Sequence, residues 1–283
     1  MSRVFITECP RDAIQGIKIF IPTEKKVAYL QALLRVGFDV LDFGSFVSPK
    51  AIPQMRDTHE VVKALDLSNT NTKLLAIVAN VRGAKEALTY LQIDYLGYPF
   101  SLSENFQMRN TNKTIQESLI VLGEIASLVK AENKEIVVYL SMGFGNPYGD
   151  PWSLTLVSEW VEKLASLGIR RFLLSDTVGV APVEVITSLF EHLIAKHPEL
   201  HFGAHLHASP NEATAKINAA YIGGCRAFDS AVRGLGGCPM AKDELVGNVP
   251  TEKLLTFLTS QGSDFDANPL HFEAAYNQSL HLF

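Results

Sequence analysis

The sequence predicts an α/β protein in which eight parallel strands close into a (β/α)8 barrel (a TIM barrel), a single domain with a short C-terminal appendage. Short runs of β-branched and apolar residues alternate with longer segments whose apolar residues have helical spacing. Eight such runs, about thirty to forty residues apart, match the βα units of a barrel. The eight expected strands are residues 4–7, 40–43, 74–79, 95–99, 136–140, 171–174, 202–207 and 227–232.

Helical patterns occupy the segments between these runs. The clearest of them cover residues 24–36, 85–91, 115–129, 152–167 and 183–195. Thr23 and Ser153 are expected N-cap residues, and Gly37 and Gly168 stand where a helix should stop. These boundary signals agree with the alternation of strands and helices.

A doubly wound open sheet is the alternative architecture. It usually carries a glycine-rich phosphate loop after its first strand, where this chain has Cys9-Pro10-Arg11-Asp12. No linker or internal repeat divides the chain, so we expect one domain over residues 1–283. The barrel should span about residues 3–250, and residues 251–283 should form a closing helix, over 252–260, and a tail.

Composition favours chemistry on a small molecule. The net charge of −5 comes without a cluster of Lys and Arg, which argues against nucleic acid or a membrane as a partner. Neither a membrane-spanning run nor a secretory pattern is visible, so we expect the protein in the cytoplasm. Cys9, Cys225 and Cys238 are too few and too irregularly spaced for a disulfide framework, so a cysteine that matters should act as a free thiol.

Two histidines, His205 and His207, end the apolar run over residues 202–207. Residues two apart on a strand share a face, so two neutral imidazoles there would form half of a metal site. A single histidine in a strand is usually a structural residue, and the pair is harder to explain in that way. The other ligands should come from the ends of neighbouring strands, where barrels gather their chemistry.

Polar groups occupy nearly all of those strand ends. Arg11-Asp12 follows the first strand, and as a surface feature such a pair would be unremarkable. At the same mouth as the histidines, Asp12 could be a carboxylate ligand and Arg11 a fixed positive charge for an oxyanion. The segment Gly234-Leu235-Gly236-Gly237-Cys238 follows the last strand, and its thiol could be catalytic or incidental. Asn248 adds a neutral oxygen at this end.

The most specific motifs lie at these same positions. They are Arg11-Asp12, Ser45-Phe46-Val47-Ser48-Pro49-Lys50, Asp176-Thr177-Val178-Gly179-Val180, His205-Leu206-His207 and Gly234-Leu235-Gly236-Gly237-Cys238-Pro239. Together they closely resemble the 3-hydroxy-3-methylglutaryl-CoA lyases, which are metal-dependent carbon–carbon lyases on a (β/α)8 barrel. The likeness runs from about residue 7 to residue 252. Arg-Asp and His-x-His are shared with related synthases.

The resemblance implies an activity and a set of site residues. The activity is cleavage of 3-hydroxy-3-methylglutaryl-CoA to acetoacetate and acetyl-CoA with Mg²⁺ or Mn²⁺, and Zn²⁺ is the less favoured metal. The implied metal ligands are Asp12, His205, His207 and Asn248. Arg11 would contact the substrate carbonyl, and Cys238 would be the catalytic thiol. Asp42, Asp176 or a metal-site histidine would take the hydroxyl proton. Further expected substrate-binding residues are Gln15, Ser45, Tyr148 and Thr177. We expect a homo-oligomer, a dimer, with an acyl-CoA as substrate.

The chain also departs from the family pattern. Asp42 replaces a glutamate, and a carboxylate retracted by about a bond length is expected to lose contact with its partner or to need a bridging water. Ala208 follows His207 where aspartate is usual, and Met142 and Asn146 replace frequent cysteines. Two alternatives therefore stay open. One is a lyase or Claisen-type synthase for another 3-hydroxyacyl-CoA, and the other is a decayed barrel that only binds a ligand.

Overall fold

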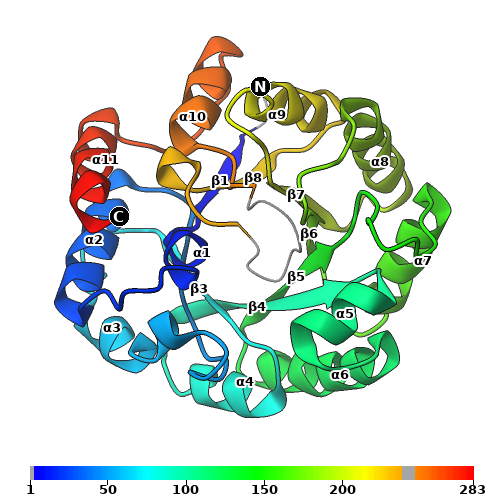
Figure 1. Cartoon of the computed structure of the whole chain (residues 1–283), viewed down its shortest axis with the longest axis horizontal. Coiled ribbons are helices and arrows are strands. Elements are labelled where there is room, and N and C mark those ends of the chain that lie inside the picture. Colours follow the sequence, from blue (N-terminus) through cyan, green and yellow to red (C-terminus); the bar gives the residue numbers. More distant parts are fainter. Residues whose placement is uncertain (1–2, 238–245) are drawn as a thin grey trace.

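Eight parallel strands form a closed barrel in the order β1 to β8 in this computed structural model, which describes residues 3–237 and 246–283 (Figure 1). The strands are β1 (Phe5–Glu8), β2 (Val40–Ser45), β3 (Lys73–Ile77), β4 (Ile93–Ser101), β5 (Glu135–Ser141), β6 (Arg171–Asp176), β7 (His201–Leu206) and β8 (Ala227–Ser230). β1 pairs with β8 through four residue pairs, which closes the barrel. The expected fold class is confirmed, and each strand overlaps its predicted range.

Helices surround the barrel and connect successive strands (Figure 1). They are α1 (Pro10–Gln15), α2 (Thr23–Val36), α3 (Thr58–Ala64), α4 (Val81–Leu88), α5 (Glu104–Thr111), α6 (Ile115–Ala131), α7 (Leu154–Ala165), α8 (Val183–Lys196), α9 (Ala213–Ile222), α10 (Thr251–Ser260) and α11 (Pro269–Leu282). Two short 3-10 turns, η1 (Pro53–Met55) and η2 (Val232–Gly234), complete the described elements.

The predicted helix ends at Ser153 and Gly37 are confirmed, and α7 ends at Ala165, three residues before Gly168. Ser153 caps α7, since its side chain accepts the Leu156 amide proton, and Gly37 ends α2 in the left-handed region at φ 86°. Thr23 is not the N-cap of α2, because Pro22 occupies that position and Thr23 is the first helical residue. The Thr23 hydroxyl instead donates to Asp57 at 2.8 Å, a partner that lies 34 residues away.

Two apolar layers hold the barrel together. The larger lies between the strands and the helices, with fully buried side chains such as Leu41, Phe172 and Phe190. A smaller layer of apolar side chains is separate from it and comes from neighbouring strands of the sheet. Its buried members are Leu75, Ile77, Val137, Tyr139 and Leu173. Since alternate residues of a strand point to opposite faces, this second layer fills the inside of the barrel on the side of β3 to β6.

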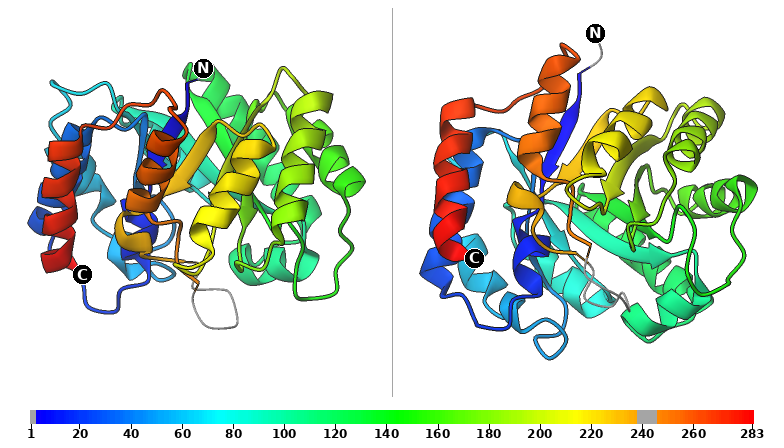
Figure 2. Two further views of the ribbon diagram at one scale, coloured as in Figure 1. Left: turned by 90° about the horizontal axis from the view of Figure 1, so that it is seen from above. Right: turned by 45° about the horizontal axis from the view of Figure 1, so that its top comes forward.

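The C-terminal residues pack against the first third of the chain. α11 lies beside α2, where Phe283 and Tyr29 make an edge-to-face contact with ring centres 5.9 Å apart (Figure 2). Leu282 and Phe283 also pack against a small buried cluster formed by Ile14, Ile21 and Met55. Among the described residues, no helix has the length and apolar character needed to cross a membrane.

Candidate active site and metal centre

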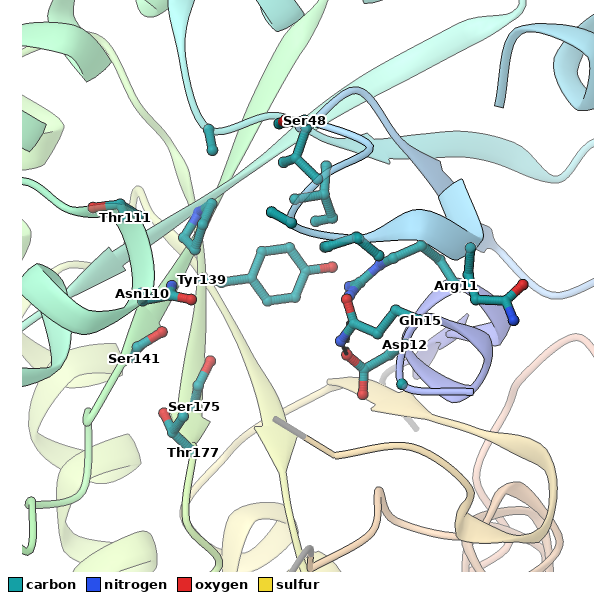
Figure 3. A pocket seen from close by; sticks show the side chains of 18 of the residues that line it. Arg11, Asp12, Gln15, Ser48, Asn110, Thr111, Tyr139, Ser141, Ser175 and Thr177 are labelled. Atoms are coloured by element: carbon teal, nitrogen blue, oxygen red, sulfur yellow. Dashed lines mark hydrogen bonds and ion pairs between the residues drawn. The ribbon is translucent and has the colours of Figure 1, made fainter. Parts of the chain in front are cut away.

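A cavity of about 600 Å³ opens where the strands end. Arg11 and Asp12 line it on one side, and Ser141, Ser175 and Thr177 line it on the other (Figure 3). His205 and His207 also contribute to its wall. A cavity of this size holds a small-molecule substrate, and it lies at the end of the barrel where enzymes of this architecture place their chemistry.

Asp12, His205 and His207 form a compact buried cluster in that wall. Each offers one ligand atom, and these atoms all lie within 4.8 Å of one another. Asn248 joins the cluster from the segment after β8, because it forms an isolated antiparallel bridge with His207. Its side-chain nitrogen donates to Asp12 Oδ2 at 2.6 Å and to Leu235 O at 2.8 Å, which leaves its oxygen as the atom that could bind a metal.

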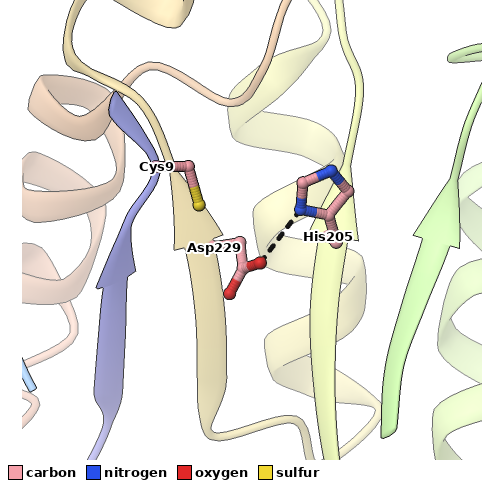
Figure 4. A group of neighbouring side chains, drawn as sticks. All are labelled: Cys9, His205 and Asp229. Atoms are coloured by element: carbon pink, nitrogen blue, oxygen red, sulfur yellow. Dashed lines mark hydrogen bonds and ion pairs between the residues drawn. The ribbon is translucent and has the colours of Figure 1, made fainter. Parts of the chain in front are cut away.

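Both histidine rings are held through Nδ1. His207 Nδ1 contacts Thr177 O at 3.0 Å, and His205 Nδ1 contacts Asp229 Oδ2 at 2.9 Å (Figure 4). With the proton on Nδ1, the Nε2 lone pair of each ring is available to a metal, a common arrangement in metal sites. His207 Nε2 is buried and has no hydrogen-bond partner among the described residues. A divalent cation would supply that partner.

The protonation states of the cluster suit a cation. Burial, followed by the charge of His205, lowers the pKa of His207 to about 4, so its ring is neutral at pH 7. Burial alone would raise the pKa of Asp12, but Arg11 and the two histidines lower it to about 2. A neutral imidazole of His207, the carboxylate of Asp12, the amide oxygen of Asn248 and the second imidazole of His205 together provide donor types that a divalent metal ion accepts.

A second group of three, Cys9, His205 and Asp229, is also within metal-binding reach (Figure 4). The His205 nitrogen on that side is already bonded to Asp229. Burial raises the pKa of the Cys9 thiol, which opposes the thiolate that a metal would need. We therefore treat Cys9 and Asp229 as supports of His205. Burial opposes a charged His205 ring, but Asp229 raises its pKa.

Arg11 forms a buried ion pair with Asp42 on β2. Its Nη2 lies 2.5 Å from Asp42 Oδ2, and its Nη1 bonds Asp12 and Gln15, each at 2.9 Å. Burial opposes the charge of Arg11, but Asp42 and Asp12 raise its pKa above the ordinary value. Burial raises the pKa of Asp42 to about 6 against the influence of Arg11. The expectation that the short Asp42 side chain would lose its partner or need a bridging water is wrong, because Asp42 contacts Arg11 directly. A register shift in β2 lies next to Asp42.

Lys216 of α9 anchors the backbone next to His207. The Lys216 side chain is 4% exposed, and its ammonium group lies 2.6 Å from Asp176 Oδ2, 2.8 Å from Gly179 O and 3.1 Å from His207 O. The other Asp176 oxygen accepts the amide protons of Val180 and Ala181. This cation therefore links the turn after β6 to the chain at His207, and that turn also supplies the carbonyl that orients the His207 ring.

Comparison with known proteins agrees with this geometry. The HMGL-like family model matches residues 4–277. The chain belongs to the HMGL-like family. It is 34% identical to the hydroxymethylglutaryl-CoA lyase YngG of Bacillus subtilis over 249 residues, which cover 88% of this chain and 82% of that protein. It is 33% identical to the mitochondrial hydroxymethylglutaryl-CoA lyase of Rattus norvegicus over 265 residues, 92% of this chain and 80% of the relative.

Solved structures extend the comparison. An HMG-CoA lyase from Acinetobacter baumannii, in complex with coenzyme A and 3-methylmalate, is 28% identical with a TM-score of 0.91, over 99% of this chain and 91% of that one. The B. subtilis HMG-CoA lyase structure is 31% identical with a TM-score of 0.92, over 99% of this chain and 93% of that one. This chain is thus an enzyme of the HMGL-like carbon–carbon lyase family.

The other site residues expected for an HMGL-like enzyme divide into two groups. Gln15 and Thr177 line the cavity, as expected of residues that touch substrate. Ser45, Tyr148 and Asp176 are not among its lining residues. The Ser45 hydroxyl donates to Ile77 O at 3.2 Å, and the Tyr148 ring stacks on Phe106 with ring centres 6.5 Å apart. Cys238 lies outside the described residues, so its role stays a prediction.

The glycines before Cys238 have a steric role. A Cβ at Gly236, where φ is +95°, would lie 2.7 Å from Asp12 O and 2.8 Å from Asn248 Nδ2. The Gly237 amide donates to Asp12 Oδ2 at 3.3 Å. Only a residue without a side chain lets this segment pass so close to two proposed metal ligands.

Sequence reasoning missed Tyr139, Asp229 and Lys216. Strand parity could have found Tyr139, because it precedes the cavity residue Ser141 by two positions on β5 and so faces the same way. Strand parity also applies to the last expected strand, residues 227–232, and would have drawn attention to Asp229 as the charged residue on one of its faces. No local signal identifies Lys216, whose partners lie 9 to 40 residues away.

Proposed function

We propose that the chain cleaves 3-hydroxy-3-methylglutaryl-CoA to acetoacetate and acetyl-CoA, with Mg²⁺ or Mn²⁺ as its metal. The observation that carries the proposal is one cavity wall in which Asp12, His205 and His207 stand next to Arg11. Such a wall can bind a divalent cation and also an oxygen that becomes negative. The HMG-CoA lyase structure with coenzyme A and 3-methylmalate supports an acyl-CoA as the substrate class.

The reaction needs negative charge stabilised at both ends of the breaking bond. The 3-hydroxyl loses its proton to a base and becomes the ketone of acetoacetate. The C2–C3 bond breaks, and its electron pair moves onto the thioester to give the enolate of acetyl-CoA. C2 of that enolate then takes a proton, for which Cys238 is the proposed donor. When bound, the metal would act as a Lewis acid for the hydroxyl oxygen.

Residues of the chain itself would bind the thioester and hold the other groups in position. Arg11 is fixed by Asp42 with its guanidinium group in the cavity wall, where it would bind the thioester oxygen. Of the acceptors proposed for the hydroxyl proton, Asp42 and Asp176 do not line the cavity, and the two histidines would have both ring nitrogens occupied once a metal is bound. Asp42 and Asp176 are each paired with a buried cation, so we assign them to positioning Arg11 and His207.

Activity measured with and without metal tests the proposal. We expect purified protein to release acetyl-CoA from 3-hydroxy-3-methylglutaryl-CoA when Mn²⁺ is present and to lose this activity after chelation. A panel of other 3-hydroxyacyl-CoA esters, assayed for cleavage and for condensation, is the control for substrate and direction. Faster turnover of another ester, or condensation alone, would contradict the proposed substrate. Full activity after chelation would contradict the metal.

A further inference from the structure

The Tyr139 hydroxyl is a polar group without a partner inside the candidate active site. Tyr139 lies on β5, is 5% exposed and lines the cavity. Its oxygen is buried and has no hydrogen-bond partner among the described residues. Leaving a buried hydroxyl unpaired costs about 1–3 kcal/mol, and phenylalanine would avoid that cost. The hydroxyl therefore costs stability unless a bound molecule pairs with it.

The surroundings of Tyr139 fix where that hydroxyl points. Its ring stands edge-on to the His205 ring, with ring centres 5.3 Å apart and an interplanar angle of 89°. On its apolar side the ring belongs to the inner cluster that includes Val137 and Leu173. The hydroxyl is directed across the cavity toward the guanidinium group of Arg11 (Figure 3). Tyr139 is thus held rigidly, with its polar end facing a buried cation.

Arg11 retains donor capacity in its guanidinium group, toward which the Tyr139 hydroxyl points (Figure 3). Its Nε and Nη2 bond Asp42, and its Nη1 bonds Asp12 and Gln15. Because Nη2 carries two protons and bonds only Asp42 among the described residues, one proton is left for another acceptor. A phenol is also a donor at neutral pH. Two donors therefore converge on one region of the cavity, beside the Asp12–His205–His207 cluster.

We propose that Tyr139 is a catalytic residue whose hydroxyl, together with Arg11 Nη2, binds the thioester oxygen of the acyl-CoA and stabilises the enolate formed there. The inference rests on the proposed function. In a 3-hydroxyacyl-CoA the hydroxyl and the thioester carbonyl are separated by a single carbon. With the hydroxyl oxygen at the Asp12–His205–His207 cluster, the thioester oxygen falls beside that cluster, where Tyr139 and Arg11 lie. Donors placed in advance at a developing negative charge are among the largest contributions to catalysis.

The test is the Tyr139→Phe variant, which removes one oxygen and nothing else. We expect the turnover of 3-hydroxy-3-methylglutaryl-CoA to fall about 10²–10³-fold, the range for loss of one such donor. The melting temperature should stay equal or rise, because no bond within the described protein is lost. Tyr98→Phe is the matched control. Tyr98 is a buried tyrosine of the neighbouring β4, and its hydroxyl contacts Ser118 of α6, away from the cavity.

A partial reaction separates this inference from the proposed substrate. Deuterium exchange from D2O into the methyl group of acetyl-CoA requires the same enolate, and we expect Tyr139→Phe to slow it by a similar factor. If wild type exchanges but does not cleave 3-hydroxy-3-methylglutaryl-CoA, the proposed substrate is wrong and the exchange rates still decide the role of Tyr139. If wild type does neither, both proposals are overturned.

Two further outcomes overturn the role of Tyr139 alone. One is an active wild type with a Tyr139→Phe variant that cleaves and exchanges within threefold of it. The other is a variant that is slow only because it melts at a markedly lower temperature, which would assign the hydroxyl a structural role. Slow cleavage and slow exchange at an unchanged melting temperature, with a fully active Tyr98→Phe, support the proposal.

Discussion

Replacement of Lys216 by methionine tests how the proposed metal ligand His207 is held in place. Methionine has a similar length and apolar stem but no charge and no donor. The variant loses three contacts at once, to Asp176 Oδ2, Gly179 O and His207 O. We expect both the stability of the fold and the affinity for Mn²⁺ to fall, because the same ammonium group supports the barrel and the turn that orients His207.

The expected size of each effect follows from the contacts. Removing one partner of a buried ion pair costs about 3–5 kcal/mol, since the other charge stays behind unpaired. Asp176 keeps the amide protons of Val180 and Ala181, so we expect the lower limit of that range. About 3 kcal/mol corresponds to a melting temperature lower by roughly 6–12 °C for a chain of this size. Loss of a partner that orients a ligand typically lowers metal affinity about 10–100-fold.

Thermal melting and calorimetric titration with Mn²⁺ are the two assays. Lys26→Met is the matched control, because Lys26 is also buried, at 3% exposed, and pairs with Asp57 at 2.7 Å on another side of the barrel. Both variants should melt at lower temperature, but only Lys216→Met should bind Mn²⁺ more weakly. Equal Mn²⁺ affinity in wild type and Lys216→Met would refute the argument. Equal losses of affinity in the two lysine variants would also refute it, because the effect would then be one of general destabilisation.

Three further changes have definite expected results. Asp229→Asn removes the carboxylate that contacts His205 Nδ1 at 2.9 Å. Calorimetric titration should therefore show an affinity for Mn²⁺ that is about 10–100-fold lower. An unchanged affinity would contradict the support of His205 by Asp229. Asp42→Asn removes the negative charge that pairs with the buried Arg11, so turnover and melting temperature should both fall. The free energy of unfolding should decrease by about 3 kcal/mol. A fully active variant would refute the positioning of Arg11 by Asp42. Burial raises the pKa of Glu8 from about 4.5 in the unfolded chain to about 8 in the folded protein. The folded state therefore favours protonated Glu8. This contribution to the free energy of unfolding is complete below pH 4.5 and is lost as the pH rises to about 8. The melting temperature of Glu8→Gln should therefore rise relative to that of wild type as the pH increases from 5 to 8. A constant difference in melting temperature across that pH range would contradict the raised pKa.

Local patterns carry most of the fold but little of the site's supporting structure. Strand parity identified His205 and His207 as neighbours on one face, and the barrel rule brought Asp12 and Asn248 to the same end. Neither rule gives distances, so neither could show that the shorter Asp42 side chain contacts Arg11 directly. The contacts of Lys216 depend on how α9 packs over the barrel, and no local propensity encodes that packing.

The buried charges around the cavity are costly to the fold. Arg11, Asp12, Asp42 and Asp229 are each 7% exposed or less, and taking an ion out of water costs several kcal/mol even in a relaxed protein. Apolar residues fill the same barrel on the side of β3 to β6 without that cost. Stability alone does not explain why one side of the barrel interior holds buried charges while the other holds apolar side chains. The charged side meets the apolar side at Tyr139, whose ring packs with Val137 and whose hydroxyl faces Arg11. Tyr139 Oη and His207 Nε2 have no hydrogen-bond partner among the described residues, and the substrate and the metal that we propose would supply those partners.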